Sequence, residues 1–104
     1  MITAIVTAPI PQGMTYEKYV ENTNRISFRF QQIPGLIRKN FLFSQAQGLG
    51  GGVYLWESRE AAEKCYAGMW RENFVKAFGV EPSIAFFDTP VVVDNAAGKI
   101  VQAA

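Results

Sequence analysis

The chain has no histidine and only one cysteine among its 104 residues. The absence of histidine excludes nucleophiles that imidazole activates, as in Ser-His-Asp or Cys-His sites, and it excludes metal sites built on imidazole. A single cysteine, Cys65, excludes an intrachain disulfide and a zinc site of paired cysteines. We therefore expect no metal. A general base would have to be a carboxylate, a lysine or tyrosine with a shifted pKa, or a water held by polar groups.

Charge and long apolar runs are also scarce. Charged residues make up 18% of the chain, the formal net charge is +1, and like charges do not cluster. We therefore expect no nucleic-acid partner. No apolar stretch approaches the roughly 20 residues that cross a bilayer, and the first residues lack the basic and long apolar regions of a signal peptide. These features predict no membrane association and a cytoplasmic location.

Apolar residues, in contrast, make up 49% of the chain. A surplus of apolar over charged side chains favours an apolar pocket, a subunit interface, or both. The length fits one domain. We assign this domain to residues 1–95 and treat residues 96–104, which show no strong pattern, as a C-terminal tail.

The apolar periodicity predicts a βαββαβ order. Short runs rich in β-branched and aromatic residues predict strands, and apolar positions three to four residues apart predict helices. The predicted strands are 1–10, 36–45, 52–58 and part of 80–95; the predicted helices are 15–31 and 58–70, the second continuing as a short helical piece over 71–79. This order is that of the ferredoxin-like α+β fold, an antiparallel four-stranded sheet with two helices on one face.

The third predicted strand carries large apolar side chains on both faces. Val53 and Leu55 alternate with Tyr54 and Trp56, so each face of the strand presents an apolar pair. The helices cover only one face of such a sheet. A second copy of the chain, related by two-fold symmetry, would cover the other, and we therefore expect a homodimer.

Four glycines lie within residues 48–52, directly before this strand. A phosphate-binding loop needs the opposite order, a strand followed by glycines and then by the N-terminus of a helix. No GK[ST] or GxGxxG motif is present either. We interpret the glycines as a flexible hairpin between the second and third strands, with Gly52 at a bulge.

Three segments, IPGLIRKNFLFS, GGVYLWESREAAEKCYAGMWRENFVKAFGVEP and FFDTPVVVDN, resemble the YdhR-like monooxygenase family of the dimeric α/β-barrel superfamily. The resemblance spans roughly residues 1–95 and implies the fold more strongly than the reaction. The superfamily also contains cofactor-free quinone-forming monooxygenases, muconolactone isomerases, chlorite-dismutase-like haem proteins and stress proteins. A haem site ordinarily uses an axial histidine, which this chain lacks.

In such folds the pocket lies between the sheet and the helices. Tyr54 and Trp56 share one face of their strand, where they either pack in the core or flank a planar ligand. Trp70 could likewise face a ligand or act as a wedge under the helix end. Arg38 and Asn40 have the same parity on the second strand, so they could hold an oxyanion such as a phenolate if their face is the pocket face. A surface or interface ion pair is the alternative for Arg38.

These five residues are the predicted ligand-binding set, and no catalytic residue is identified. Cys65 is interpreted as a small buried hydrophobe. The resemblance implies a homodimer that binds a small hydrophobic or aromatic molecule and acts as a monooxygenase without a cofactor. Two alternatives remain open. One is a non-catalytic small-ligand-binding or stress-related module. The other is a small lactone isomerase or lyase, which would need a proton-transfer residue that the sequence does not identify.

Overall fold

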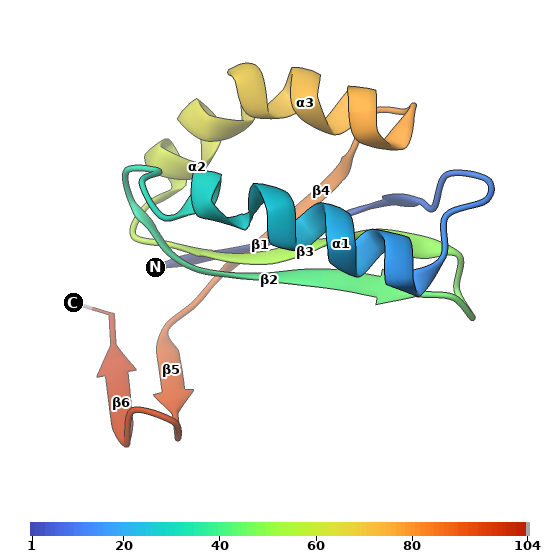
Figure 1. Cartoon of the computed structure of the whole chain (residues 1–104). Coiled ribbons are helices and arrows are strands. Elements are labelled where there is room, and N and C mark those ends of the chain that lie inside the picture. Colours follow the sequence, from blue (N-terminus) through green and yellow to red (C-terminus); the bar gives the residue numbers. More distant parts are fainter. Residues whose placement is uncertain (104) are drawn as a thin grey trace.

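The computed structural model describes residues 1–103, and its body is one four-stranded antiparallel sheet with the strand order β2-β3-β1-β4 (Figure 1). The elements, in chain order, are β1 (Ile2–Pro9), α1 (Tyr16–Ile26), the 3₁₀ helix η1 (Ser27–Phe30), β2 (Leu36–Ser44), β3 (Leu49–Trp56), α2 (Arg59–Tyr66), α3 (Met69–Phe78), β4 (Ser83–Asp88), β5 (Val91–Asp94) and β6 (Lys99–Gln102). The helices lie on one side of the sheet. The predicted ferredoxin-like α+β fold is confirmed.

The helices begin at capping residues that the sequence marks clearly. Thr15 caps α1, and its side chain accepts a hydrogen bond from the backbone N–H of Lys18; Ser58 caps α2 in the same way. The predicted first helix changes to 3₁₀ geometry at Ser27. The predicted second helix is divided at Gly68, which has extended backbone geometry and serves as the N-cap of α3.

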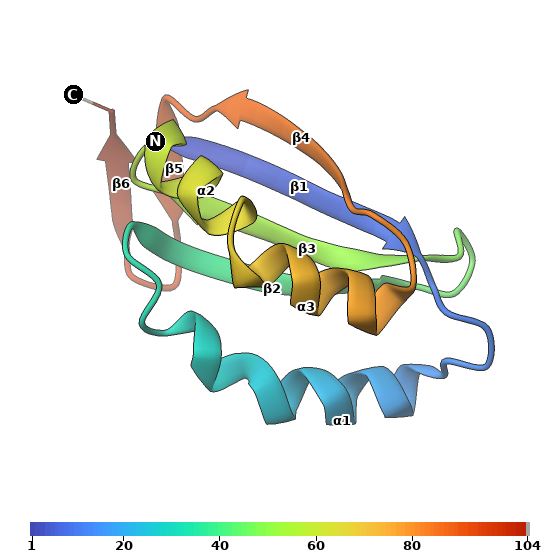
Figure 2. The ribbon, with the colours of Figure 1, turned by 90° about the horizontal axis from the view of Figure 1, so that it is seen from above.

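The core lies between the sheet and the helices. Alternate residues of β1 and β3 point toward the helices, as the two-residue period of a strand requires. Figure 2 shows α2 and α3 crossing above the sheet and α1 running beside them on the β2 side. The buried apolar residues are Ala4, Val6, Ala8, Tyr19, Tyr54, Trp56, Ala62, Tyr66 and Phe74.

The glycine stretch belongs mostly to β3 itself and not to the turn before it. Gly50, Gly51 and Gly52 pair with residues of both neighbouring strands, while Gly48, at φ +67°, lies in the turn. Gly51 has φ +147°, and a Cβ at this position would lie 1.9 Å from the Val6 carbonyl oxygen. Tyr19 on α1 uses this bare backbone, because its hydroxyl donates to the Gly51 carbonyl and accepts from the Gly51 N–H.

The predicted bulge at Gly52 is wrong. The pairing of β2 with β3 shifts between Leu36 and Arg38, so Ile37 is the extra residue and the bulge is on β2. Residues 49–56 of β3 keep a regular register with β1, and residues 49–55 keep one with β2, so the pairing at Gly52 is regular on both sides. The three consecutive glycines therefore allow neighbouring elements to pack closely against the backbone of β3, and they do not change its register.

The C-terminal segment differs from the expected tail. Strands β5 and β6 form a hairpin that projects from the body on the side of the sheet opposite the helices (Figure 1). Residues 95–98 form its turn, so the predicted domain boundary at residue 95 falls inside the hairpin. The sequence pattern did not predict β6, because Lys99–Gln102 is exposed on all four residues and shows no apolar alternation.

Within residues 1–103, no helix combines the length and the apolar character that crossing a membrane requires.

Replacing Gly51 by alanine should destabilise the fold strongly. The new Cβ would overlap the Val6 carbonyl oxygen, and the backbone of β1 would have to move. We expect the free energy of unfolding to fall by about 3 kcal/mol or more, measured by urea denaturation. Gly48→Ala is the matched control, because Gly48 also has a positive φ but has no atom within 4 Å of the built Cβ. The control should lose only about 1–2 kcal/mol. Equal losses would show that the predicted clash with β1 does not occur.

Candidate functional site

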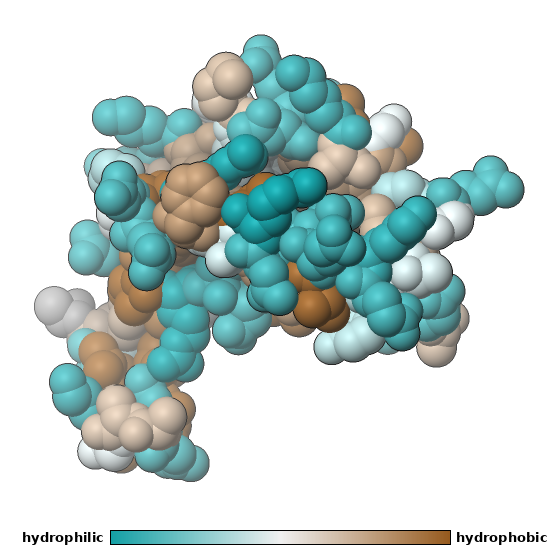
Figure 3. Space-filling model, in the orientation of Figure 1, coloured by the Kyte–Doolittle hydropathy of each residue, from teal (hydrophilic) through white to brown (hydrophobic). Residues whose placement is uncertain are grey.

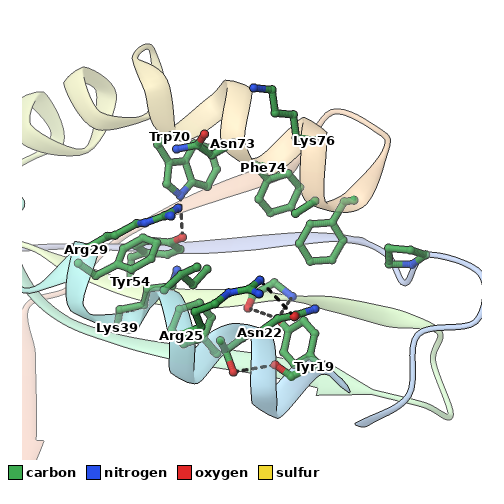
Figure 4. Close-up of a pocket in the computed structure, with 18 of the residues that line it drawn as sticks. Tyr19, Asn22, Arg25, Arg29, Lys39, Tyr54, Trp70, Asn73, Phe74 and Lys76 are labelled. Carbon is green, nitrogen blue, oxygen red and sulfur yellow. Dashed lines mark hydrogen bonds between the residues drawn. The ribbon is translucent and has the colours of Figure 1, made fainter. Parts of the chain in front are cut away.

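A pocket of about 650 Å³ lies between α1 and α3, over strands β2 and β3 (Figure 4). A volume of this size is typical of sites for small organic molecules. Its lining is mainly aromatic and aliphatic, with Met14, Ile26, Phe30, Ile33, Phe41, Tyr54, Trp70, Phe74 and Phe78 among the apolar or aromatic members. The pocket lies where the sequence analysis expected it, between the sheet and the helices.

Four aromatic side chains form one connected wall of this region. Tyr54 and Trp56 stack along β3 with their ring centroids 6.0 Å apart, and Tyr66 and Trp70 meet Tyr54 edge to face. Two hydrogen bonds hold the set. The Trp70 indole N–H donates to the Tyr54 hydroxyl at 3.0 Å, and the Trp56 indole N–H donates to the Tyr66 hydroxyl at 3.1 Å. This network holds the Tyr54 ring in a defined position beside the pocket.

The tyrosines of this wall remain protonated at neutral pH. Burial raises the pKa of Tyr54 far above its usual range, and burial also raises the pKa of Tyr66. Since the Tyr54 oxygen accepts the Trp70 hydrogen bond, its own proton is available for donation to a ligand. Tyr54 can therefore act as a hydrogen-bond donor but not as a general base at neutral pH.

Lys39 is the most unusual residue of the pocket. It lies on β2, directly opposite Tyr54 in the pairing of β2 with β3. Its Nζ is 3.3 Å from the ring centroid of Phe30, 3.8 Å from that of Phe41 and 4.6 Å from that of Tyr54. Ring faces attract a cation, and here they replace part of its hydration. Burial lowers the pKa of Lys39 to about 7, so the side chain titrates near neutral pH.

A glycine makes room for this lysine. A Cβ built on Gly52 would lie 3.1 Å from the Lys39 Cε, which is closer than ordinary van der Waals contact. The aliphatic stem of Lys39 therefore lies across the bare backbone of β3 before the amine reaches the rings. Gly52 thus contributes to the pocket by its lack of a side chain.

The two strand residues predicted to hold an oxyanion lie on the wrong face. Arg38 and Asn40 are exposed and point away from the helices, and neither lines the pocket. Arg38 instead forms an ion pair with Asp94 of β5 at 2.8 Å, which is the alternative considered for it above. The condition for their oxyanion role, that their strand face is the pocket face, is not met.

The bulge at Ile37 explains this difference. Leu36 packs against the core, and a regular strand would then turn Arg38 and Asn40 inward as well. The extra residue reverses the parity, so Lys39 and Phe41 face the pocket. Lys39 thereby shares its strand face with Phe41 and Phe43, whose rings contact aromatic residues of the first helical segment.

The three aromatic candidates have different positions. Tyr54 and Trp70 both line the pocket. Trp56 is fully buried and packs beneath Tyr66, outside the lining. Cys65 is half-buried against the core, and burial raises the pKa of its thiol to about 11, as suits a small hydrophobe and not a nucleophile. The ligand roles of Tyr54 and Trp70 remain predictions.

The residues that a metal would need are not gathered anywhere in residues 1–103. No group of three or more Cys, Asp or Glu side chains in this range is arranged to hold an ion. The polar groups of the pocket are instead hydrogen-bond donors and cations, including Asn22, Arg25, Arg29 and Asn73 (Figure 4). Such a lining can bind and orient an organic molecule and can exchange a proton through Lys39.

The family model described as "Putative mono-oxygenase ydhR" matches residues 7–88. The chain belongs to this mono-oxygenase family. The match runs from β1 to the end of β4 and so includes every strand and helix that lines the pocket. The predicted family is confirmed. No curated protein matches the chain.

Solved structures share the fold. A monooxygenase from the gene ActVA-Orf6 of Streptomyces coelicolor, in complex with the ligand nanaomycin D, superimposes with a TM-score of 0.65 at 19% identity, covering 88% of this chain and 89% of that one. An antibiotic biosynthesis monooxygenase gives 0.63 at 13% identity, covering 86% and 98%. A third structure, described as a "putative antibiotic biosynthesis monooxygenase" from Deinococcus radiodurans, gives 0.61 at 13% identity, covering 90% and 97%. At these identities the similarity shows the fold alone.

Exchanging Lys39 for methionine should change how stability depends on pH. A lysine in an unfolded chain has a pKa of about 10.4, whereas burial lowers the pKa of Lys39 in the folded protein to about 7. Between these values the unfolded chain binds more protons, so the lysine contribution to the free energy of unfolding increases with pH. Relative to wild type, Lys39→Met should therefore be most stable at pH 6 and lose this advantage toward pH 8.5, by at most about 1.4 kcal/mol per pH unit.

Urea denaturation at several pH values measures the difference in the free energy of unfolding between Lys39→Met and wild type. Groups that titrate in the same way in both proteins do not contribute to this difference. Lys64→Met is the control, because Lys64 is exposed on α2. Its curve should run parallel to that of wild type. A parallel curve for Lys39→Met would show that the Lys39 pKa is not lowered in the folded protein.

Proposed function

We propose that the pocket between α1 and α3 binds a small aromatic compound and that the protein oxidises this compound with dioxygen, using the electrons of the substrate itself. The observation that carries the proposal is the Tyr54–Trp70 pair. Its rings meet at 84° beside the cavity, and the Tyr54 hydroxyl keeps a proton for donation. A planar ligand could stack against these rings while one of its oxygens accepts that proton in a hydrogen bond.

Membership of the mono-oxygenase family supports the reaction type. The structural relative from Streptomyces coelicolor, which is in complex with the ligand nanaomycin D, supports a small molecule as the kind of ligand for this fold. The absence of histidine and of clustered metal ligands in residues 1–103 fits chemistry that depends on positioning.

The reaction can be written for an anthrone-type substrate. Loss of a proton gives an electron-rich anion, which transfers electrons to dioxygen. One oxygen atom forms the new C=O bond at the ring CH₂ carbon, and the other leaves as water with the two hydrogens, so that R₂CH₂ + O₂ gives R₂C=O + H₂O. The protein would supply hydrogen-bond donors for the anion and an apolar enclosure, and these lower the barrier by electrostatic stabilisation and orientation.

A lactone isomerase is the second candidate, and Lys39 is the observation that favours it. An isomerase needs a group that takes up and returns a proton, and an amine with a pKa near 7 inside the pocket meets this need. The two functions differ in oxygen demand. An isomerase leaves the mass of the substrate unchanged and works without oxygen.

We expect oxygen uptake when the purified protein meets an anthrone or a quinol-type compound. An oxygen electrode combined with mass spectrometry should show one dioxygen consumed per molecule of anthrone and a product heavier by one oxygen and lighter by two hydrogens. Prolonged dialysis against a metal chelator should leave the rate unchanged. Uptake no faster than in buffer would argue against the monooxygenase function, and tight binding without turnover would then favour a non-catalytic binding module.

We further propose that two chains associate through the face of the sheet that the helices do not cover. This face carries partly exposed Ile5 and exposed Phe87, beside Val53 and Leu55 of β3. The β5–β6 hairpin adds the cross-strand pair Val93 and Ile100, which are 64% and 68% exposed. Figure 3 shows apolar side chains on this hairpin below the body. Apolar groups gathered on one side in this way are typical of a subunit interface.

Sedimentation should give the mass of a dimer at micromolar concentration. Phe87→Glu places a charge in the proposed interface, because Phe87 is 52% exposed on the uncovered face, and it should shift the protein to monomer. Phe28→Glu is the matched control, since Phe28 is 65% exposed on η1, on the helical side. The control should remain a dimer. A wild-type monomer, or a dimer that tolerates Phe87→Glu, would contradict this interface.

A further inference from the structure

The pocket carries a charge bias that the chain as a whole does not have. The whole sequence has 10 basic and 9 acidic residues, so its charges nearly balance. The described pocket lining contains four basic residues and no Asp or Glu: Arg25, Arg29, Lys39 and Lys76. Figure 4 shows Arg25 and Arg29 directed across the pocket, whereas the Lys76 amine turns away from the sheet. The bias is therefore a property of this site.

Lys39 is the cation that lies deepest, and no counter-charge meets it. Three ion pairs form among residues 1–103, and none of them includes Lys39. No hydrogen bond from its amine to another residue occurs in this range either. Its amine lies over the ring faces of Phe30, Phe41 and Tyr54. Ring faces compensate a buried charge only in part, so a position for an anion is left open beside the amine.

We propose that the ligand of this pocket is an aromatic compound with an acidic group, and that the Lys39 ammonium holds this group as its anion. The proposal rests on the aromatic pocket of the proposed function and names the class of molecule within it. The apolar part of the ligand lies along Trp70 and Phe74, which line the same cavity. The acidic group sits between Lys39 and the Tyr54 hydroxyl, which belong to directly opposed residues of β2 and β3. Arg25 and Arg29 attract the anion toward the pocket without closing on it.

Binding of an anion then depends on the proton that Lys39 carries. In the free protein the amine loses its proton as the pH rises through about 7. An anion beside the ammonium stabilises the charged form and raises the pKa of Lys39 in the complex. By linkage, anion affinity should fall as the pH increases from 6 to 8.5, while the affinity of a neutral compound of the same shape should stay constant.

The other groups around Lys39 do not produce this pattern. Burial raises the pKa of each tyrosine and cysteine near Lys39, so these side chains stay neutral over this range. They are Tyr19 on α1, Tyr54 on β3, and Tyr66 and Cys65 on α2. The guanidinium groups of Arg25 and Arg29 stay charged throughout. Lys76 on α3 lines the same pocket, but its amine points away from the sheet (Figure 4).

A pair of fluorescent probes tests the proposal. 1-Anilinonaphthalene-8-sulfonate carries a sulfonate that is ionised at every pH used, and N-phenyl-1-naphthylamine has the same rings without the sulfonate. Titrations of the full-length protein at pH 6 and pH 8.5 give both dissociation constants. We expect the sulfonate probe to bind about 10-fold more weakly at pH 8.5 than at pH 6, and the neutral probe to bind equally at both.

Lys39→Met assigns the effect to one residue. At pH 6 this variant should bind the sulfonate probe about 10-fold more weakly than wild type, lose the pH dependence, and keep its affinity for the neutral probe. Lys64→Met, on the exposed face of α2, should behave as wild type with both probes. Circular dichroism verifies the fold of each variant. If Lys39→Met does not fold, the titrations of the wild-type protein with both probes at pH 6 and pH 8.5 still test the proposal, because they need no variant.

The outcomes separate this proposal from the proposed function. Preference for the sulfonate probe without pH dependence would place the anion at the arginines and overturn the role of Lys39. Equal binding of both probes at both pH values would overturn the acidic ligand class while leaving an aromatic pocket intact. Failure of both probes to bind would instead count against the pocket of the proposed function.

Discussion

The close contact of bare backbone in β3 with the elements around it is the constraint on which the rest of the structure depends. At Gly51 a side chain would overlap the Val6 carbonyl of β1, and the Tyr19 hydroxyl bonds both backbone groups of this glycine. At Gly52 the missing side chain leaves space for the stem of Lys39. Gly51 therefore attaches α1 to the sheet and lines the pocket, and Gly52 beside it leaves the space that the lysine occupies.

The aromatic side chains convert this backbone arrangement into a site. Beyond the glycines, β3 continues with Tyr54 and Trp56, whose hydroxyl and indole groups are bonded to Trp70 and Tyr66 on the covering helices. Each bond satisfies a polar group that the core would otherwise leave without a partner. The same bonds hold the rings at fixed angles. A rigid wall of this kind suits a planar ligand, because little side-chain entropy is lost on binding.

Much of the fold could be predicted from the sequence because its signals are local. Thr15 and Ser58 cap helices by bonds to residues three positions later, and Gly79 ends α3 with a left-handed backbone. The alternation of Tyr54 and Trp56 with Val53 and Leu55 also marked a strand with two apolar faces. The β5–β6 hairpin escaped prediction because all four residues of β6 are exposed and show no apolar alternation that separates a strand from a tail.

The sequence by itself determined the βαββαβ order of the body of the protein and the composition that leaves the pocket without histidine. Only the tertiary structure decided which side chains of β2 enter the pocket. One extra residue at Ile37 reverses the parity of every position after it, so Arg38 and Asn40 face outward and Lys39 faces Tyr54. A bulge depends on how two strands pair across space. Both faces of β2 carry apolar residues, so the pattern of β2 alone did not indicate the inward face, and the pairing with β3 settled it.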